Sequence, residues 1–289
     1  MPESTIADFV ARFLADSRAE SDPVKGRVVL SQKRLVLASS EGRTTIPLRD
    51  VFDVVVGHVP VGLTDFFEDT VAVAYSRDDE RLTAILEADG ETVTRFRTVL
   101  FKALLQGATV RIKHPARVGG RFTDASSETA SLHLGEQAVT FTGIEPPLRI
   151  DLSDVTYYSK TDRTIDGRVR PALEVEYTSD GQAITSEIVL SSARRMNLLG
   201  RYLRLEYSEL VSEVRDVELS EAELELLTAI YSGAGEGHLA GVLGMEPSSV
   251  TMLLNTLEDK RLLSTTDEGT HITSLGRLAV SDRVEYVNA

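Results

Sequence analysis

The chain contains no cysteine and no tryptophan, and it lacks any apolar run close to the length of a membrane-spanning helix. Without cysteine, disulfide bonds and thiolate metal sites are excluded. A spanning helix needs about 20 consecutive apolar residues, so we expect no membrane insertion. The first residues carry Glu3 and Asp8 and have no long apolar core, unlike a secretory signal peptide. These absences predict a cytoplasmic protein.

Lysine is also scarce, with 6 Lys beside 25 Arg, while 45 residues are acidic and the formal net charge is −14. In concentrated salt, interactions between charges are screened within about 3 Å, and excess surface carboxylates help to keep chains apart. The composition therefore favours a haloarchaeal source over an ordinary acidic cytosolic protein. The negative charge also argues against binding to nucleic-acid phosphates or anionic lipid.

One stretch of the chain occurs twice. Residues 30–51 read LSQKRLVLASSEGRTTIPLRDV, and residues 134–155 read LGEQAVTFTGIEPPLRIDLSDV. Equivalent residues such as Ile46 and Ile150 are 104 positions apart. Solenoid repeats have periods of roughly 20 to 50 residues, so this longer period predicts two copies of one domain.

Each copy has the pattern of several short strands followed by one amphipathic helix. In the first copy, residues 23–115, we expect strands at 26–30, 34–38, 44–48, 51–56, 71–75 and 81–86, and a helix at 91–106. In the second copy, residues 116–214, we expect strands at 131–134, 138–142, 148–150, 155–158, 172–177 and 184–190, and a helix from about Ser191. A helix that covers the inward face of antiparallel strands is typical of a PH-like β-barrel or sandwich.

The segments on either side of the duplication have different patterns. Residues 1–22 predict an amphipathic helix whose apolar face either covers one end of the first copy or forms a subunit contact. In residues 215–289, Ser220 and Glu223 form a capping-box pattern. Helices are then expected at 221–231, 238–243 and 247–259, a hairpin of 260–264 with 271–274, and a last helix from 275. This order is typical of a winged helix-turn-helix domain.

The complete prediction is an α+β protein with two tandem PH-like barrel or sandwich domains, each closed by a helix, and a C-terminal winged helix-turn-helix domain. In a DNA reader of this kind, residues 247–259 would enter the major groove. The first basic residue there is Lys260, at the end of the helix, and residues 216–289 carry 4 basic and 13 acidic residues. We therefore favour a protein contact or a scaffold role over DNA binding.

No pattern of catalytic or metal-binding residues is evident. The five histidines share no ligand spacing, and there is no phosphate-binding loop and no nucleophile-elbow motif. Asp50 and Asp154 are equivalent residues of different copies, so we expect them to have structural roles at a turn. We predict a protein that is not an enzyme and has no cofactor and no metal.

Partner-binding residues are expected where the two copies differ most. The connection at residues 57–70 contains Asp65, Phe66 and Phe67, and its alternative interpretation is a small satellite core. The equivalent connection at residues 160–171 contains Arg163 and Arg168, and its alternative is a solvated charged loop. In the C-terminal region, Met245 and Met252 are adaptable contact residues in one interpretation and core residues in the other.

The sequence resembles the archaeal taxis protein family CheF. The similarity extends over nearly the whole chain and includes LSQKRLVL, TTIPLRDV, VPVGLTDFFEDTVAVAY and LSEAELELLTAIYSG. This resemblance implies an adaptor that connects phosphorylated CheY to the switch complex at the base of the archaellum, the archaeal motility filament. We also expect a homodimer, through the N-terminal segment or the helix of the second copy.

Two other functions remain open at this point. A transcription regulator would use the C-terminal domain to bind DNA and the two copies as sensors. A PH-like lipid-binding protein would need a basic rim, whereas Arg43 and Arg49 lie among acidic residues. The adaptor is our preferred interpretation because the resemblance implies it, and it requires neither a basic surface nor catalytic residues.

Overall fold

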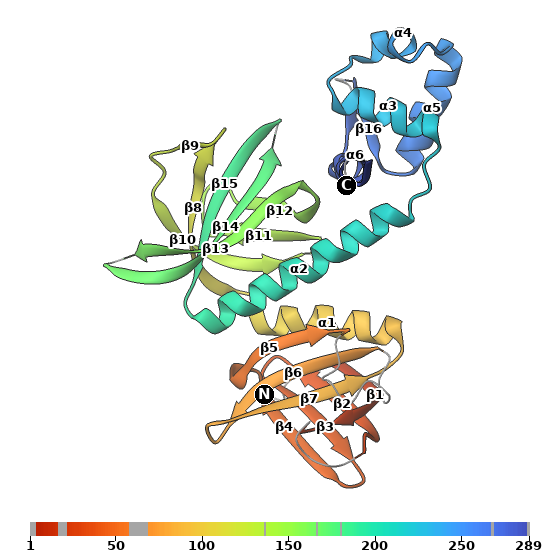
Figure 1. The fold of residues 1–289 in the computed structure, drawn as a ribbon. Coiled ribbons are helices and arrows are strands. Elements are labelled where there is room, and N and C mark those ends of the chain that lie inside the picture. Colours follow the sequence, from red (N-terminus) through yellow and green to blue (C-terminus); the bar gives the residue numbers. More distant parts are fainter. Residues whose placement is uncertain are drawn as a thin grey trace. The chain divides into compact units, whose positions relative to one another are not determined.

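The computed structural model contains helices and antiparallel strands (Figure 1). It describes residues 4–16, 22–57, 69–135, 137–165, 167–179, 181–266 and 269–287. The chain divides into two compact units. The N-terminal unit comprises Met1–Ile150 and Thr156–Leu203, and the C-terminal unit comprises Asp151–Val155 and Arg204–Ala289.

The first sheet of the N-terminal unit has seven antiparallel strands in the order β4-β3-β2-β1-β7-β6-β5. Its strands are β1 (Thr5–Leu14), β2 (Val24–Ser31), β3 (Arg34–Ser39), β4 (Gly42–Pro47), β5 (Val51–Val56), β6 (Thr70–Arg77) and β7 (Glu80–Glu87). A short 3₁₀ helix, η1 (Leu48–Asp50), turns the chain from β4 to β5, and helix α1 (Gly90–Leu105) follows β7. The side chain of Asp89 caps α1 by accepting a hydrogen bond from the backbone N–H of Thr92 at 2.9 Å.

The second sheet repeats this arrangement. Its strands are β8 (Ala108–Val118), β9 (Arg121–Phe122), β10 (Ser127–Leu134), β11 (Ala138–Thr142), β12 (Leu148–Asp151), β13 (Val155–Ile165), β14 (Arg168–Ser179) and β15 (Gln182–Leu190). The order β12-β11-β10-β8-β15-β14-β13 matches the first sheet strand for strand, with β9 paired to β8. The 3₁₀ helix η2 (Leu152–Asp154) and helix α2 (Ala193–Asp216) correspond to η1 and α1. The common order is what a duplication requires.

The sheets are large antiparallel sheets and not closed barrels, which corrects part of the predicted fold class. In the first sheet, β4 and β5 are the two edge strands, and no hydrogen-bonded ladder joins them among the described residues. A side chain lies against the edge of β4 instead, because Arg77 of β6 donates to the carbonyl of Thr45 at 3.3 Å. The backbone pairing that would close a barrel is therefore missing.

The predicted N-terminal helix is wrong, because its residues form strand β1. This strand pairs with β2 from Thr5, opposite Ser31, to Phe13, opposite Val24. The sequence TIADFVARFL fits both a helix and a strand. In a helix its large apolar residues would share one face, whereas in a strand every second residue points inward. Pairing with a neighbouring strand selects the second arrangement. The copies therefore begin at β1 and β8, and the predicted boundary at residue 115 falls inside β8.

Helices α1 and α2 bury the apolar faces that the sequence predicts for them. Val93, Phe96, Leu100 and Leu104 of α1 are buried, as are Met196, Leu199, Tyr202 and Leu203 of α2. The rings of Phe101 and Tyr202 lie 5.7 Å apart, and the Tyr202 hydroxyl donates to the carbonyl of Gly135 at 2.9 Å. The closing helices of the two copies thus contact each other inside the N-terminal unit.

The C-terminal unit has the predicted order of elements. It contains α3 (Glu221–Tyr231), η3 (Glu236–His238), α4 (Leu239–Leu243), α5 (Pro247–Asp259), the hairpin of β16 (Leu263–Thr266) and β17 (Gly269–Ile272), and α6 (Ser274–Val287). Its core is formed by residues such as Leu226, Leu227, Leu257 and Leu262, all of which are fully buried. Within the described part of the chain, no helix is long and apolar enough to cross a membrane.

The predicted capping box at the start of α3 is confirmed. The Ser220 hydroxyl accepts from the backbone N–H of Glu223, and the Glu223 carboxylate accepts from the backbone N–H of Ser220 at 2.7 Å. The other oxygen of Glu223 accepts from the Lys260 ammonium at 2.6 Å. Burial opposes ionisation here, but these hydrogen bonds outweigh it and lower the pKa of Glu223 from its ordinary value.

Replacing Glu223 with glutamine is expected to destabilise the C-terminal unit by about 2 kcal/mol at neutral pH. The lowered pKa means that the ionised carboxylate stabilises the fold above the ordinary carboxylate pKa of about 4.3. That contribution is lost as the pH falls through the folded-state value, so the difference between wild type and Glu223→Gln should disappear in acid. Urea unfolding over a pH series measures this difference. Glu225→Gln, on the exposed side of α3, is the control, and equal effects of the two variants would contradict the prediction.

Candidate functional site

Histidine and carboxylate side chains do not form a metal site in the described part of the chain, where no group of three or more such residues could hold an ion. Two histidines have polar neighbours instead. His114 Nδ1 lies 2.9 Å from the Ser186 hydroxyl, and His133 Nε2 lies 2.8 Å from the Thr142 hydroxyl.

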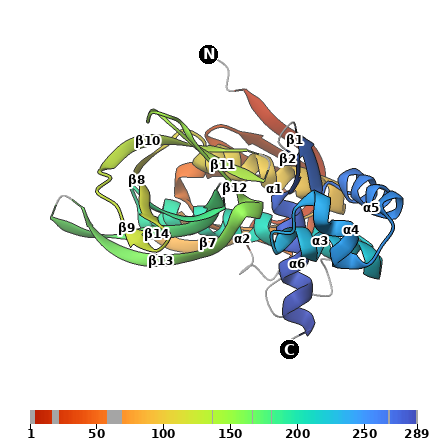
Figure 2. The same cartoon turned by 90° about the horizontal axis from the view of Figure 1, so that it is seen from above.

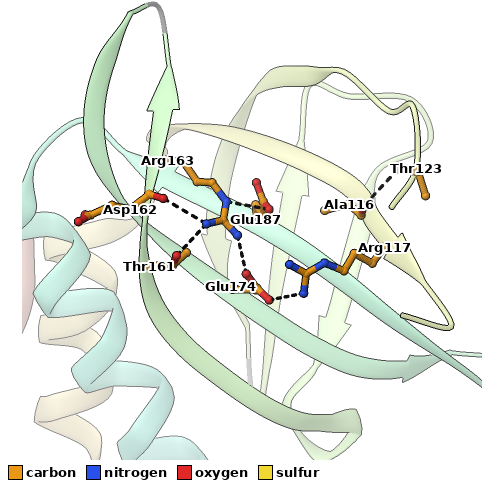
Figure 3. Close-up of polar contacts among 8 residues, drawn as sticks. All are labelled: Ala116, Arg117, Thr123, Thr161, Asp162, Arg163, Glu174 and Glu187. Carbon is orange, nitrogen blue, oxygen red and sulfur yellow. Dashed lines mark hydrogen bonds and ion pairs between the residues drawn. The ribbon is translucent and has the colours of Figure 1, made fainter. Parts of the chain in front are cut away.

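Arg163, which we predicted to contact a partner, lies in a network of ion pairs on the second sheet (Figure 3). Its Nη2 and Nε atoms contact the carboxylates of Glu174 and Glu187 at 2.7 and 2.9 Å. Its Nη1 donates to the hydroxyl of Thr161 at 2.7 Å and to the carbonyl of Asp162 at 3.1 Å. Since a guanidinium has five N–H donors, most of its binding capacity is used within the sheet. This geometry favours a structural role for Arg163.

The same network leads to an exposed aromatic residue that we did not predict. Glu174 also accepts from Arg117 at 2.8 Å, and the Arg117 guanidinium lies 4.5 Å from the centre of the Phe122 ring. Thr123 holds the short β8–β9 hairpin in place by donating from its backbone N–H to the carbonyl of Ala116 at 3.1 Å. Phe122 is nevertheless 73% exposed. Exposed aromatic side chains held in one orientation are typical anchors of protein interfaces.

The two methionines differ in their positions. Met245 is partly buried and packs against the hydrophobic core of the C-terminal unit, which favours its core interpretation. Met252 lies on α5 and is 65% exposed. The α5 surface therefore presents one adaptable apolar side chain where a DNA reader would present basic residues.

A groove of about 830 Å³ lies beside α3 and α4 in the C-terminal unit. Leu224, Ala229 and Leu243 contribute to its apolar lining, and Val242 at its side is 63% exposed. Glu225 also lines the groove, and none of its described lining residues is basic.

The remaining predicted residues receive no side-chain description. Asp65, Phe66 and Phe67 lie outside the described residues, so their role stays a prediction. Arg168 is the first residue of β14, and the position of its side chain is likewise not described.

Two arginines of α2 that the sequence did not single out fasten this helix to the first sheet. Arg194 donates from Nη1 to the carbonyls of Leu48 at 3.1 Å and Val51 at 2.7 Å, and also to that of Arg49. Burial and then the charge of Arg195 lower the pKa of Arg194 from its ordinary value. About two helical turns further along α2, Arg201 forms two hydrogen bonds of 3.1 Å with the carboxylate of Asp53.

The turns η1 and η2 therefore have different partners, although they are equivalent in the duplication. Asp50 of η1 lies 3.7 Å from Arg49, whereas Asp154 of η2 accepts from Arg277 of α6 at 3.2 Å. Arg277 and Asp154 both belong to the C-terminal unit. An arginine from a following helix thus contacts each turn.

Replacing Arg194 with alanine is expected to destabilise the N-terminal unit by about 2 kcal/mol, because three carbonyls at η1 lose a charged donor. Arg195→Ala is the matched control, since Arg195 donates to the exposed Ser191 at 3.2 Å. Urea unfolding of both variants measures the effect. A loss for Arg195→Ala as large as that for Arg194→Ala would contradict the role given to the carbonyl contacts.

The fold and these surfaces define a duplicated antiparallel-sheet protein with exposed apolar side chains suited to protein contacts. Residues 5–209 match the family described as archaeal chemotaxis signal transduction system protein F. Over 288 residues, 100% of both chains, the sequence is 49% identical to Taxis protein CheF2 of Halobacterium salinarum. It is also 27% identical over 290 residues, 98% of both chains, to Taxis protein CheF1 of the same organism.

The chain therefore belongs to the CheF family of archaeal chemotaxis signal-transduction proteins. The two relatives from Halobacterium support the halophilic origin predicted from the composition. Among solved structures, inner membrane complex sub-compartment protein 3 from Toxoplasma gondii has 14% identity and a TM-score of 0.28, with 40% of this chain and 82% of that chain covered. Similarity at that level carries no inference about this chain.

Proposed function

We propose that this chain is a non-enzymatic adaptor that binds phosphorylated CheY and links it to the archaellum switch complex, and so controls the direction of rotation. The observation that carries the proposal is the 49% identity, over the full length of both chains, to a protein named as a taxis protein of the CheF family. The adaptor would act in the cytoplasm at the base of the motor. It would need no catalytic residue, no cofactor and no metal.

The distribution of exposed apolar side chains supports a protein with more than one binding surface. Phe122 lies in the N-terminal unit, whereas Met252 and Val242 lie in the C-terminal unit, and all three are more than half exposed. In concentrated salt, exposed ion pairs contribute little to affinity. Apolar and aromatic anchors would then supply most of the binding free energy.

The switching mechanism follows from differential binding. Phosphorylation changes the population of CheY conformations, and the adaptor biases the motor only through its difference in affinity for those conformations. A coupling free energy of about 1 to 3 kcal/mol corresponds to roughly a 5- to 150-fold change in affinity. Such a range is sufficient for a graded change in rotation.

The domain assignments that accompany this proposal are PH-like for the two sheet copies and winged helix-turn-helix for α3 to α6. In this interpretation, α5 serves as a protein contact. The ammonium of Lys260, at the end of α5, is engaged by Glu223 and by the carbonyl of Glu218 at 2.7 Å. That engagement favours protein binding over the alternative, a DNA-binding transcription regulator. A gel shift at low salt that showed a specific DNA complex would support the alternative instead.

The proposal is tested by titrating the full-length chain with CheY from its own organism in molar salt. One series uses CheY carrying the beryllofluoride phosphoryl mimic, and the other uses unmodified CheY. Tighter binding of the activated form, by about tenfold or more, is the expected result. Equal affinities, or no binding in either series, would overturn the adaptor proposal.

Replacing Met252 with alanine is expected to lower the affinity for one partner, CheY or the switch complex, by about tenfold. The free energy of unfolding should change by less than about 0.5 kcal/mol, because the side chain is exposed. Met245→Ala should show the opposite pattern, with reduced stability and little direct effect on affinity. Unchanged affinity of Met252→Ala for both partners would remove α5 from the binding surface.

A further inference from the structure

In each copy the first strand pairs with the last strand, β1 with β7 and β8 with β15, and the length of this seam differs between the two copies. In the second copy, β8 pairs with β15 along Val110–Val118 and Ile184–Leu190. In the first copy, the pairing of β1 with β7 extends over Arg12–Leu14 and Ile85–Glu87. Residues Thr5–Ala11 of β1 continue past the end of β7 and, within the described residues, have no ladder partner on that side.

A strand that is paired on one side leaves alternate N–H and C=O groups directed to its other side. Thr5–Ala11 pairs with β2 on one side, and within the described residues no strand pairs with its backbone groups on the β7 side, so another extended chain can pair there. In the second copy, β8 begins at Ala108, and β15 pairs with it from Val110 onward. Ala108 lies opposite Leu132 as Phe9 lies opposite Val28, 104 residues earlier. Most of the open edge of β1 is therefore a strand extension that the second copy lacks.

A hollow follows the open edge. It has a volume of about 580 Å³ and is lined by Ile6 to Phe9 of β1 and by residues of α1. The ribbons of β1 and α1 are labelled in Figures 1 and 2. Phe96 and Val99 of α1 give it an apolar wall, with the rings of Phe9 and Phe96 5.1 Å apart. Ile6, at its border, is 38% exposed.

A second hollow, of about 430 Å³, begins where the first one ends. It is lined by the next residues of β1, Val10 to Arg12, so the two hollows follow consecutive residues of one strand. Its charged lining residues have both signs: Asp69, Glu87 and Asp89 lie with Arg12 and with Lys25 of β2, and Arg12 and Glu87 form an ion pair of 3.0 Å. The slot is thus apolar at one end and carries charges of both signs at the other.

We propose that this slot between β1 and α1 binds an extended segment of a protein partner by adding a strand to the open edge of β1. The segment would carry apolar residues at alternate positions opposite Phe9, Phe96 and Val99, with polar residues between them. Main-chain hydrogen bonds provide affinity in such strand addition, and the side-chain pockets provide specificity. The slot shares no residue with the Phe122 and Met252 surfaces, and its test does not depend on CheY.

The test is a selection of displayed random peptides of about 12 residues against the full-length chain in molar salt. Enriched sequences are expected to alternate apolar and polar residues. Hydrogen exchange of the chain with the best peptide should show slower exchange of the amides in Thr5–Ala11, because a paired strand protects them. Selection of no peptide, or protection elsewhere with none in β1, would overturn the proposal.

Two substitutions in the slot sharpen the test. Val99→Arg would fill the apolar end from α1, and Ile6→Arg would crowd its border from a more exposed position. Each should weaken the best peptide by about tenfold or more, whereas Val242→Arg in the C-terminal unit should leave its affinity unchanged. Thermal unfolding separates lost binding from lost folding for Val99→Arg, and the exposed Ile6→Arg remains informative if Val99→Arg unfolds. Equal affinity for both slot variants and the wild type would contradict the slot.

Discussion

Replacing Gly276 with alanine is expected to destabilise the C-terminal unit by about 3 kcal/mol. A Cβ atom at this position of α6 would lie 2.2 Å from the carbonyl oxygen of Leu262 and 2.8 Å from Cγ1 of Ile272. The carbonyl cannot move away easily, since it accepts hydrogen bonds from both the backbone N–H and the hydroxyl of Thr273 at 3.0 Å. Glycine at 276 therefore allows the start of α6 to pack directly against Leu262, which precedes β16, and Ile272 of β17.

Gly241→Ala is the matched control, because Gly241 lies in α4 and a Cβ atom there meets nothing within 4 Å. Alanine has a higher helix propensity than glycine by about 1 kcal/mol, so this variant should be neutral or slightly more stable. Hydrogen exchange and urea unfolding of the full chain measure both variants. A Gly276→Ala protein as stable as Gly241→Ala would show that the close approach of α6 is not as described.

Gly26→Ala is expected to have a similarly large effect, about 3 kcal/mol, in the N-terminal unit. A Cβ atom at Gly26 would lie 2.3 Å from the carbonyl oxygen of Ala38 on the neighbouring strand and 2.8 Å from Cε1 of Phe13. The equivalent position of the second copy, 104 residues later, is Ala130, which is buried. The two sheets have thus diverged in packing at a position that their strand order makes equivalent.

The control in the same unit is Gly90→Ala at the start of α1, where the nearest contact of a Cβ atom is 3.5 Å to Asp69. This ordinary van der Waals distance predicts little change in stability. Thermal unfolding followed by the signal of the β-sheet compares the two variants. If Gly26→Ala has the stability of Gly90→Ala, the first sheet must relax around Gly26 more freely than the packing indicates.

Local sequence signals were sufficient for most of the fold. In the C-terminal unit, the capping box and the periodic apolar residues predicted α3 and α5 with their observed bounds, because each signal lies within the element that it specifies. Strand β1 was missed because its apolar residues fit a helix equally well and pairing decided between the two. Strand β8 was missed because Pro115 lies within it, at a register irregularity opposite Thr185 and Glu187.

The candidate surfaces were less predictable, since they depend on residues that are distant in sequence. Arg163 on β13 contacts Glu174 on the neighbouring strand β14 and Glu187 on β15, one strand further, and a charged loop in the sequence does not reveal such pairing. Phe122 follows a turn with no periodic pattern, so nothing in the sequence marked it as exposed. The slot beside β1 became visible only through the different seams of the two copies.

The proposed adaptor role requires that the chain bridges CheY and the archaellum switch complex. Recruitment of CheY to the switch complex measures this bridging most directly. Immobilised switch complex would be exposed to beryllofluoride-activated CheY in molar salt, with and without this chain. The account predicts that activated CheY is retained only when the chain is present, and that unmodified CheY is retained much less. Equal retention of activated CheY without the chain, or no retention with it, would contradict the adaptor role.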